Sequence, residues 1–443
     1  MAYAPRVRTF SGQFLGCKVS QTDLEGLREA LAATGLEERA EGGDVHVVNG
    51  CCVTAEAVAK TRQAVRRARR GGAQVLVTGC AARLGDPGLA GLEGVHVVAR
   101  ASEETPQAVA HVLDGLGCVG GLRLAPAAPG RVRAFLRVQD GCSFSCAFCV
   151  IPQVRGGTRS RPLEAILAEA GRRVRQGFGE LVLAGVNVGL YRARDEGGGR
   201  LGLAEVIRAV GGVEGAGRLR LSSIEPDHLD EPVLEALAAH ALPHLHVPLQ
   251  AGSDAILAAM RRRYRGAGYL RRIERARSVL GVDLHVTADV MVGFPGETED
   301  DFAETLAVAA AAEFDYAYTF VFSPRPGTEA AELSDRFVDP GATAERFQRL
   351  RVVVERSALA KHRGRIGRVE DVLVEGPSKK DPSITSARTA QNKLVHFRSE
   401  STLRPGTYAS VEVTGAAPHH LRGELREVLA EPAHRRRIPV NAG

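Results

Sequence analysis

The chain has 443 residues, more than one ordinary hydrophobic core accommodates, so two or three domains are expected. Charged residues make up 25% of it, no apolar stretch approaches the ~18 residues of a membrane span, and the start MAYAPRVRTF lacks the apolar core of a secretion signal. The eight cysteines fit a reducing compartment better than a disulfide framework, and the net charge of +6 permits a polyanionic partner such as RNA, so we expect a cytoplasmic protein without a membrane partner.

Residues 1–117 alternate strand and helix patterns. The runs VRTFSGQF, VHVVN and QVLVTG are typical of strands. A helix is predicted over TDLEGLREALAATG, where Thr22 and Glu25 form a capping-box pattern and Gly35 is the expected stop. A basic helix is predicted from about Glu56 to Arg70. Short strands that alternate with helices indicate a doubly wound parallel sheet.

Three cysteines follow these three strands. Cys17, Cys51 and Cys80 each lie one to three residues beyond a predicted strand end. Because ligands gather at the carboxyl ends of parallel strands, we expect these cysteines to converge and to form an iron–sulfur cluster site. The alternative is three ordinary buried cysteines, since free cysteine is among the most buried residue types. Cys52 and Cys118 have no such placement and are assigned no role.

The next segments are a linker and a central domain. Residues 118–132 are rich in Gly, Pro and Ala and read as a linker. Over residues 133–359, six strand-like runs alternate with helical patterns: AFLRVQD, ELVLAG, RLRLSS, HLHVPL, DLHVTADVMVG and YAYTFVF. Six such units predict a partial (β/α)6 barrel, in which active residues sit on the loops that follow the strands.

The loop after the first of these strands carries Cys142, Cys146 and Cys149 in a C-x3-C-x2-C run, with Phe148 just before the last cysteine. Three thiolates on one tight loop can bind three irons of a 4Fe–4S cluster and leave the fourth iron open to a cofactor. A structural zinc site is the alternative, but it normally needs four ligands, and only Cys118 could supply the fourth. The run resembles the signature of the radical S-adenosylmethionine (SAM) superfamily.

Loops after the later strands hold further candidates for cofactor contacts, each of which could instead be a plain turn. His244 and His246 share a strand face without a third ligand nearby in sequence, so no metal is expected there. The candidate positions are Gly185, Asn187, Ser223, Gln250, Ser253 and Gly293.

The C-terminal composition changes to short β-rich runs. Residues 360–430 predict a small antiparallel β-barrel, a type that commonly binds nucleic acid, and residues 431–443 form a basic tail. The basic runs at 66–70 and 261–265 are either solvated helix faces or a track for RNA phosphates.

Taken together, the motifs resemble the radical SAM methylthiotransferases, in order and over nearly the whole chain. They are GCKVSQTD, VVNGCCVTAEA, VTGCA, DGCSFSCAFCVIPQVRGGTRSRP, LAGVNVGLY, RLSSIEP, HLHVPLQAGSD, DVMVGFPGETEDDF and SPRPGTEAAEL. The resemblance implies an N-terminal domain with an auxiliary cluster, a barrel with the SAM-binding cluster, and a C-terminal RNA-binding TRAM barrel.

Three branches of that family act on threonylcarbamoyladenosine in tRNA, on isopentenyladenosine in tRNA, or on an aspartate of a ribosomal protein. GCKVSQ, the GVN turn and RLSSIEP are most similar to the threonylcarbamoyladenosine branch, which predicts methylthiolation at C2 of that nucleoside at position 37. ARTAQNKLVHF looks closer to the isopentenyl branch. VVNGCCVT departs from the usual Asn-Thr-Cys-Thr, and alignment on that pattern selects Cys51 over Cys52 as the ligand.

The resemblance also implies the cofactors and the partners. Cys142, Cys146 and Cys149 would bind the cluster that cleaves SAM, and Cys17, Cys51 and Cys80 would bind a second 4Fe–4S cluster that holds or supplies sulfur. The partners would be tRNA, an electron donor such as a flavodoxin or ferredoxin, and a sulfur source. A non-catalytic iron–sulfur protein that binds RNA is the alternative from another functional class.

Overall fold

The computed structural model describes residues 9–99, 104–116 and 132–432. Cys118, nearly all of the predicted linker and most of the predicted basic tail therefore lie outside the described residues. The described chain divides into two compact units. Of the described residues, the first comprises 9–99 and 104–116 with Asp140–Arg159 and Ser323–Glu332. The second comprises 132–139, Ser160–Phe322 and the residues from Leu333 onward.

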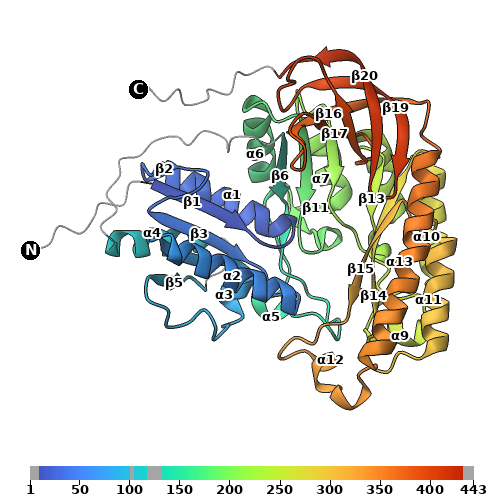
Figure 1. Cartoon of the computed structure of the whole chain (residues 1–443), viewed down its shortest axis with the longest axis horizontal. Coiled ribbons are helices and arrows are strands. Elements are labelled where there is room, and N and C mark those ends of the chain that lie inside the picture. Colours follow the sequence, from blue (N-terminus) through green and yellow to red (C-terminus); the bar gives the residue numbers. More distant parts are fainter. Residues whose placement is uncertain (1–8, 100–103, 117–131, 433–443) are drawn as a thin grey trace, which may run out of the picture. The chain divides into compact units, whose positions relative to one another are not determined.

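The first unit is built on a parallel sheet with the strand order β2-β1-β3-β4-β5 (Figure 1). This order is one of the two common doubly wound arrangements, which confirms the predicted fold class of the N-terminal domain. Its strands are β1 (Thr9–Phe14), β2 (Glu37–Glu38), β3 (Val45–Gly50), β4 (Gln74–Thr78) and β5 (Val95–Val97). Its helices are α1 (Lys18–Ala33), α2 (Ala55–Arg70), α3 (Gly79–Arg83), α4 (Thr105–Gly115), α5 (Ile151–Arg155) and α12 (Glu329–Glu332).

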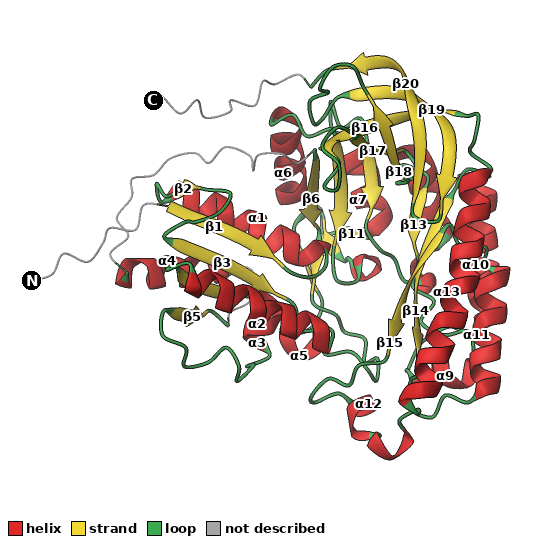
Figure 2. Cartoon of the chain, viewed as in Figure 1, coloured by secondary structure: helices red, strands yellow, loops and turns green. Residues whose placement is uncertain are grey.

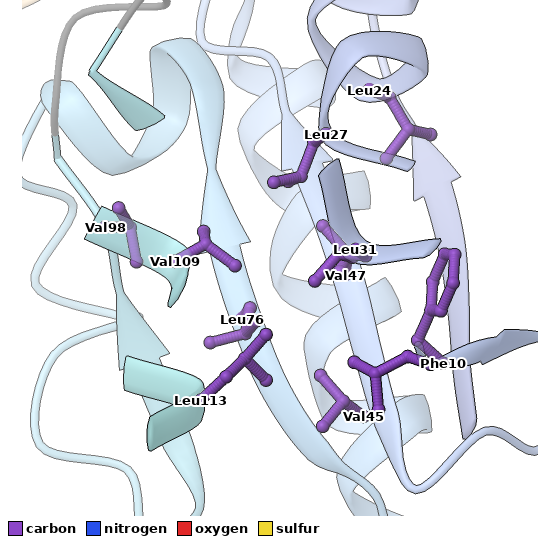
Figure 3. Packing of buried hydrophobic residues seen from close by; sticks show 11 residues of the cluster. Phe10, Leu24, Leu27, Leu31, Val45, Val47, Leu76, Val98, Val109 and Leu113 are labelled. Atoms are coloured by element: carbon purple, nitrogen blue, oxygen red, sulfur yellow. The ribbon is translucent and has the colours of Figure 1, made fainter. Parts of the chain in front are cut away.

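Helices cover both faces of this sheet. Leu24, Leu27 and Leu31 recur at helical spacing on α1 and pack with α4 against one face (Figure 3). On the other face, residues of α2 and α3 pack against Val75 and Val77 of β4. Because both faces are buried, the central strands read as continuous apolar runs rather than alternating ones.

Helix α1 begins earlier than its capping pattern predicted. Its N-cap is Cys17, whose side chain makes no capping hydrogen bond, and Thr22 lies inside the helix, where its hydroxyl donates to the Val19 carbonyl at 2.8 Å. The capping box of Thr22 and Glu25 was therefore wrong, because the chain turns into the helix only three residues after β1 ends. Gly35, with φ +86°, follows the end of the helix as expected.

The second unit contains six parallel strands in two three-stranded sheets, of order β12-β9-β6 and β13-β14-β15. Backbone hydrogen bonds from Leu242 to Leu219 (2.8 Å) and from Ile224 to His246 (2.9 Å) join β12 to β13. The six strands are β6 (Arg133–Arg137), β9 (Glu180–Ala184), β12 (Leu219–Leu221), β13 (His244–His246), β14 (His285–Val292) and β15 (Tyr316–Val321). This arrangement confirms the predicted partial barrel.

Helices alternate with these strands along the chain. They are α6 (Leu163–Arg175), α7 (Leu203–Gly211), α8 (Glu231–His240), α9 (Asp254–Ala259), α10 (Gly266–Leu280), α11 (Glu299–Ala311) and α13 (Pro340–Arg363). Short strands are β7 (Gln139–Asp140), β8 (Arg159–Ser160), β10 (Ala193–Arg194) and β11 (Arg200–Leu201). Across the described residues, no helix combines the length and the hydropathy that a membrane crossing requires.

Five C-terminal strands close into a barrel of order β16-β17-β18-β20-β19, drawn in yellow in Figure 2. They are β16 (Val369–Pro377), β17 (Thr385–Thr389), β18 (Leu394–Arg398), β19 (Tyr408–Ala417) and β20 (His420–Ala430). The barrel was predicted, but β17 and β20 were not recognised, because β20 exposes most of its charged residues and both strands lack a long apolar run. The pairing of β18 with β20 is parallel, unlike the others.

A buried ionic group attaches this C-terminal barrel to the six-stranded part of the same unit. Glu180 of β9 accepts hydrogen bonds from Arg218 (3.1 Å) and Arg220 (2.8 Å). Arg218 directly precedes β12, and Arg220 lies within it. The same guanidinium groups donate to the carbonyls of Thr389 and Ala390 at 3.0 Å. Burial raises the pKa of Glu180, but the two arginines outweigh it and bring the pKa to about 2. The carboxylate therefore stays charged.

We expect Glu180→Ala to destabilise the second unit by about 3–5 kcal/mol, because it leaves two buried guanidinium groups without their anion. The shift of the urea midpoint, followed by circular dichroism, measures this effect. Glu231→Ala is the matched control, since Glu231 forms its bidentate pair with Arg275 in solvent and should leave the midpoint nearly unchanged. Equal shifts for the two variants would contradict the proposed role of the buried group.

Candidate metal centre

Cys142, Cys146 and Cys149 lie on one tight loop between β7 and α5. The Cys142 amide donates to the Gly156 carbonyl at 3.0 Å, and the Cys149 amide donates to the Cys146 carbonyl at 3.0 Å. The three cysteines are half-buried, as is Phe148. The loop therefore presents three thiols at partly accessible positions.

A glycine closes this loop. Gly141 has φ +67°, and a Cβ atom at this position would lie 2.1 Å from the Gly157 carbonyl oxygen. Only glycine fits that approach without moving the backbone. The backbone at the start of the cysteine loop thus packs against Gly156 and Gly157, and this contact helps to position the thiols.

The second set of cysteines follows three strands that are neighbours in the first sheet. Cys17 is the N-cap of α1, Cys51 comes directly after β3, and Cys80 is the second residue of α3, directly after β4. The strands β1, β3 and β4 are adjacent and parallel. Their carboxyl ends therefore bring the three cysteines to one sheet edge. Cys17 is exposed, whereas Cys51 and Cys80 are buried.

Close packing places Cys51 against the turn that carries Cys17. A Cβ atom at Gly16, whose φ is +131°, would lie 2.9 Å from Cys51 Cβ and 3.2 Å from its Sγ. Burial, together with charges on Cys17 and Cys80, raises the pKa of Cys51 to about 11. A thiol in this position releases its proton when a cationic centre binds it.

The donor set suits an iron–sulfur cluster. The seven described cysteines are reduced thiols. Among the described residues, no three His, Cys, Asp or Glu side chains meet closely enough to hold a single metal ion. A cluster of four irons and four sulfides is larger than one ion, so its ligands stand farther apart around it. Two sets of three thiols, one on a single loop and one at a single sheet edge, offer the type and number of ligands that a 4Fe–4S cluster with one open iron takes.

Cys52 is fully buried beside Cys80. A hydrogen bond between the two thiols raises the pKa of Cys52 and lowers the pKa of Cys80. Cys51, in contrast, has both Cys17 and Cys80 as neighbours. This arrangement favours Cys51 as the third member of the set and gives Cys52 a supporting position.

Arg155 is a site residue to which sequence reasoning gave no role. Its Nε donates to Cys80 Sγ at 3.2 Å, its Nη1 to Asp140 at 2.9 Å, and its Nη2 to Asp23 at 2.6 Å. Burial lowers the pKa of Arg155, but Asp23, Cys80 and Asp140 together hold that pKa above its usual range. One feature of the sequence could have pointed to Arg155: it is the single charged residue of α5, the short helix that follows the cysteine loop.

In the second unit, the turn after β9 contacts Gln139. The Asn187 amide donates to Gln139 Oε1 at 2.8 Å, and a Cβ atom at Gly185 would lie 3.0 Å from the same oxygen. The side-chain oxygen of Asn187 is buried without a hydrogen-bond partner. A buried acceptor of this kind is costly unless a ligand donates to it.

The other predicted cofactor contacts differ in their burial, backbone conformation and hydrogen bonds. Ser223 is half-buried just after β12. Gln250 has φ +63°, and its amide donates to the Asp289 carbonyl at 2.8 Å. Ser253 is the N-cap of α9 and donates to Asp301 at 2.5 Å, so its hydroxyl is engaged. Gly293 has φ +76° and donates to Glu297 at 2.9 Å.

Further polar side chains lie along β13, β14 and β15 and in the loop after β12. Glu225 forms an ion pair with Arg262, and His246 Nε2 lies 3.3 Å from Asp289 Oδ2. The His246 ring contacts Tyr318 edge to face at 5.9 Å. Burial raises the pKa of Glu225, and Arg262 opposes that shift.

Comparison with known families divides the chain into three parts. Residues 9–98 match the Uncharacterized protein family UPF0004, residues 136–309 match the Radical SAM superfamily, and residues 363–425 match the TRAM domain. The cysteine sets fall within the first two matches, and the third covers the C-terminal barrel up to residue 425 of β20.

Similar proteins cover nearly the whole chain. A tRNA-2-methylthio-N(6)-dimethylallyladenosine synthase from Nocardia farcinica is 36% identical and aligns over 99% of this chain and 95% of its own. A protein of the same name from Acidothermus cellulolyticus is 38% identical, over 94% and 88%. A radical S-adenosylmethionine methyltransferase from Kitasatospora setae, solved with cobalamin and a [4Fe-4S] cluster, superposes with a TM-score of 0.52 at 15% identity, covering 73% and 77%. This last similarity concerns the fold alone.

Proposed function

The chain belongs to the radical SAM methylthiotransferase family, and on that premise we propose that it methylthiolates C2 of N6-dimethylallyladenosine (isopentenyladenosine) at position 37 of tRNA. It is an enzyme whose cofactors are SAM and 4Fe–4S clusters. The threonylcarbamoyladenosine branch predicted from GCKVSQ and RLSSIEP is not confirmed, because the similar proteins carry the dimethylallyl name. The main structural support for methylthiolation is the pair of three-cysteine sets within one compact unit. The choice of nucleoside rests on the similar proteins.

Each cysteine set has a separate task in this proposal. Cys142, Cys146 and Cys149 would bind the cluster that contacts SAM, and Cys17, Cys51 and Cys80 would bind the auxiliary cluster. When bound, these cofactors supply the radical and the sulfur that an unactivated C–H bond requires, since no acid or base of the chain can remove that hydrogen. The residues of the chain bind and orient the reactants and exclude water.

The turn after β9 is suited to SAM. The unpartnered, buried oxygen of Asn187 is an acceptor for the methionine ammonium group, and Gly185 lets that group approach the backbone. Phe148, Ser223, Gln250 and Gly293 are further proposed cofactor contacts. Ser253 keeps its role as a helix cap and would contribute only through the backbone that it positions.

A basic patch on the C-terminal barrel supports tRNA as the partner. The patch consists of Lys380, His396, His419, His420 and Arg422. The rings of His396 and His420 lie 5.1 Å apart, and besides burial, His396, Arg422, His419 and Lys380 all lower the pKa of His420. Lys380, His419 and Arg422 are exposed. Cations beside stackable rings suit the phosphates and bases of RNA.

We expect Lys380→Gln combined with Arg422→Gln to weaken tRNA binding and to flatten its dependence on salt. Each lost phosphate contact lowers the slope of log affinity against log salt by about one, so the slope should fall by about two. Charge substitution is preferable to truncation here, because removal of the barrel would expose the buried arginines at β12.

The measurement is tRNA affinity at several salt concentrations. Arg271→Gln combined with Arg275→Gln on α10 is the control with equal charge loss. If the control variant flattened the slope as much as the patch variant, the barrel would not be the specific RNA-binding surface.

The function itself is tested by mass spectrometry of tRNA nucleosides from cells with and without this protein. We expect the methylthio group to disappear from dimethylallyladenosine in cells that lack it. Its disappearance from threonylcarbamoyladenosine instead would support the second candidate, which the RLSSIEP and GVN motifs favour. Unchanged tRNA nucleosides would overturn the proposal and direct attention to a protein substrate.

A further inference from the structure

One buried guanidinium group, that of Arg155, contacts segments that carry both cysteine sets. Arg155 lies on α5, and this helix begins at Ile151, two residues after Cys149. One of its acceptors, Asp140, precedes Cys142 by two residues, and another is Cys80 itself. The third acceptor, Asp23, lies on α1, the helix capped by Cys17. All of these residues belong to the first unit.

The geometry requires an arginine. Three different nitrogens of the planar fork donate to three acceptors at 2.6–3.2 Å, and the side chain is only 1% exposed. A lysine carries the same charge at a single nitrogen and cannot reach acceptors spread around a fork. An arginine that served only to neutralise Asp23 and Asp140 would not need to contact sulfur. The hydrogen bond to Cys80 therefore indicates a further role.

We propose that Arg155 is a positioning residue that orients Cys80 toward the auxiliary cluster and raises the reduction potential of that cluster. This inference rests on the proposed ligation by Cys17, Cys51 and Cys80. Hydrogen bonds to ligand sulfurs tune iron–sulfur potentials, because a donor stabilises the more negative, reduced state. Asp23 and Asp140 in turn hold the guanidinium in place and moderate its charge.

The experiment isolates the auxiliary cluster in the full-length chain. A parent variant with Cys142, Cys146 and Cys149 changed to Ala is reconstituted anaerobically, and its iron content and midpoint potential are measured by redox titration with electron paramagnetic resonance. Arg155→Lys and Asp23→Asn are then compared with this parent. A parent without iron would mean that the proposed ligand set has failed, which separates that failure from failure of the role given to Arg155.

We expect Arg155→Lys to shift the equilibrium at least tenfold toward the oxidised cluster, which corresponds to about 59 mV for one electron. Asp23→Asn should shift the potential in the opposite direction, because the guanidinium is then less neutralised. A folded Arg155→Lys variant that binds no iron would also support a positioning role. Because lysine keeps the positive charge, the loss of iron would then come from the changed hydrogen-bond geometry at Cys80.

Two results would overturn the inference. The first is an Arg155→Lys variant with full iron content and the potential of the parent. The second applies if Arg155→Lys does not fold: an unchanged potential in Asp23→Asn then excludes an electrostatic influence of this group on the cluster.

Discussion

Replacement of Cys142, Cys146 and Cys149 with alanine is expected to abolish reductive cleavage of SAM and to halve the iron content. Two clusters should give about eight irons per chain after anaerobic reconstitution, and loss of one ligand set should leave about four. The loss of SAM cleavage should be complete, because the proposed function has these thiols hold the iron to which SAM binds. The measurements are iron and sulfide analysis and chromatography of 5′-deoxyadenosine after reduction with dithionite.

Ser145→Ala is the matched control for this prediction. Ser145 lies in the same loop and is exposed, so its removal should change neither the iron content nor SAM cleavage. Purified protein that contains zinc and takes up no iron would contradict the cluster assignment for this loop. Persistent SAM cleavage in the triple variant would do so as well.

Replacement of Cys17, Cys51 and Cys80 with alanine is expected to separate the two chemical tasks. 5′-Deoxyadenosine should still form, because the SAM-binding loop from Cys142 to Cys149 is untouched. The methylthio product should be lost entirely, since the proposal has the sulfur held or supplied by a cluster bound to these cysteines. Product analysis by mass spectrometry and the 5′-deoxyadenosine assay on the same samples test both parts.

Single substitutions decide which of two adjacent cysteines is the ligand. We expect Cys51→Ala to lose the auxiliary cluster, because Cys51 packs against Gly16 and has Cys17 and Cys80 as neighbours. Cys52→Ala should retain the cluster, since Cys51, and not Cys52, is the cysteine that has both Cys17 and Cys80 as neighbours. The reverse outcome would show that Cys52 is the ligand.

The positions of both cysteine sets were predictable from the sequence, and so was the edge at which one set lies. Apolar runs revealed the strands that precede Cys17, Cys51 and Cys80, and parallel strands share one carboxyl edge. The spacing from Cys142 to Cys149 was informative because a short loop constrains its own side chains. Capping was less predictable: Thr22 and Glu25 matched a capping pattern, yet the turn after β1 starts α1 at Lys18.

By itself, the sequence determined the three-part architecture, the cysteine sets and the family of reactions, because each depends on residues close together in the chain or on repeated local patterns. Only the tertiary structure showed that Arg155 reaches Asp23, 132 residues away, and that Arg218 and Arg220 hold the C-terminal barrel through Thr389 and Ala390. Such partners depend on which elements pack together, and a buried charge carries no local pattern that names its partner.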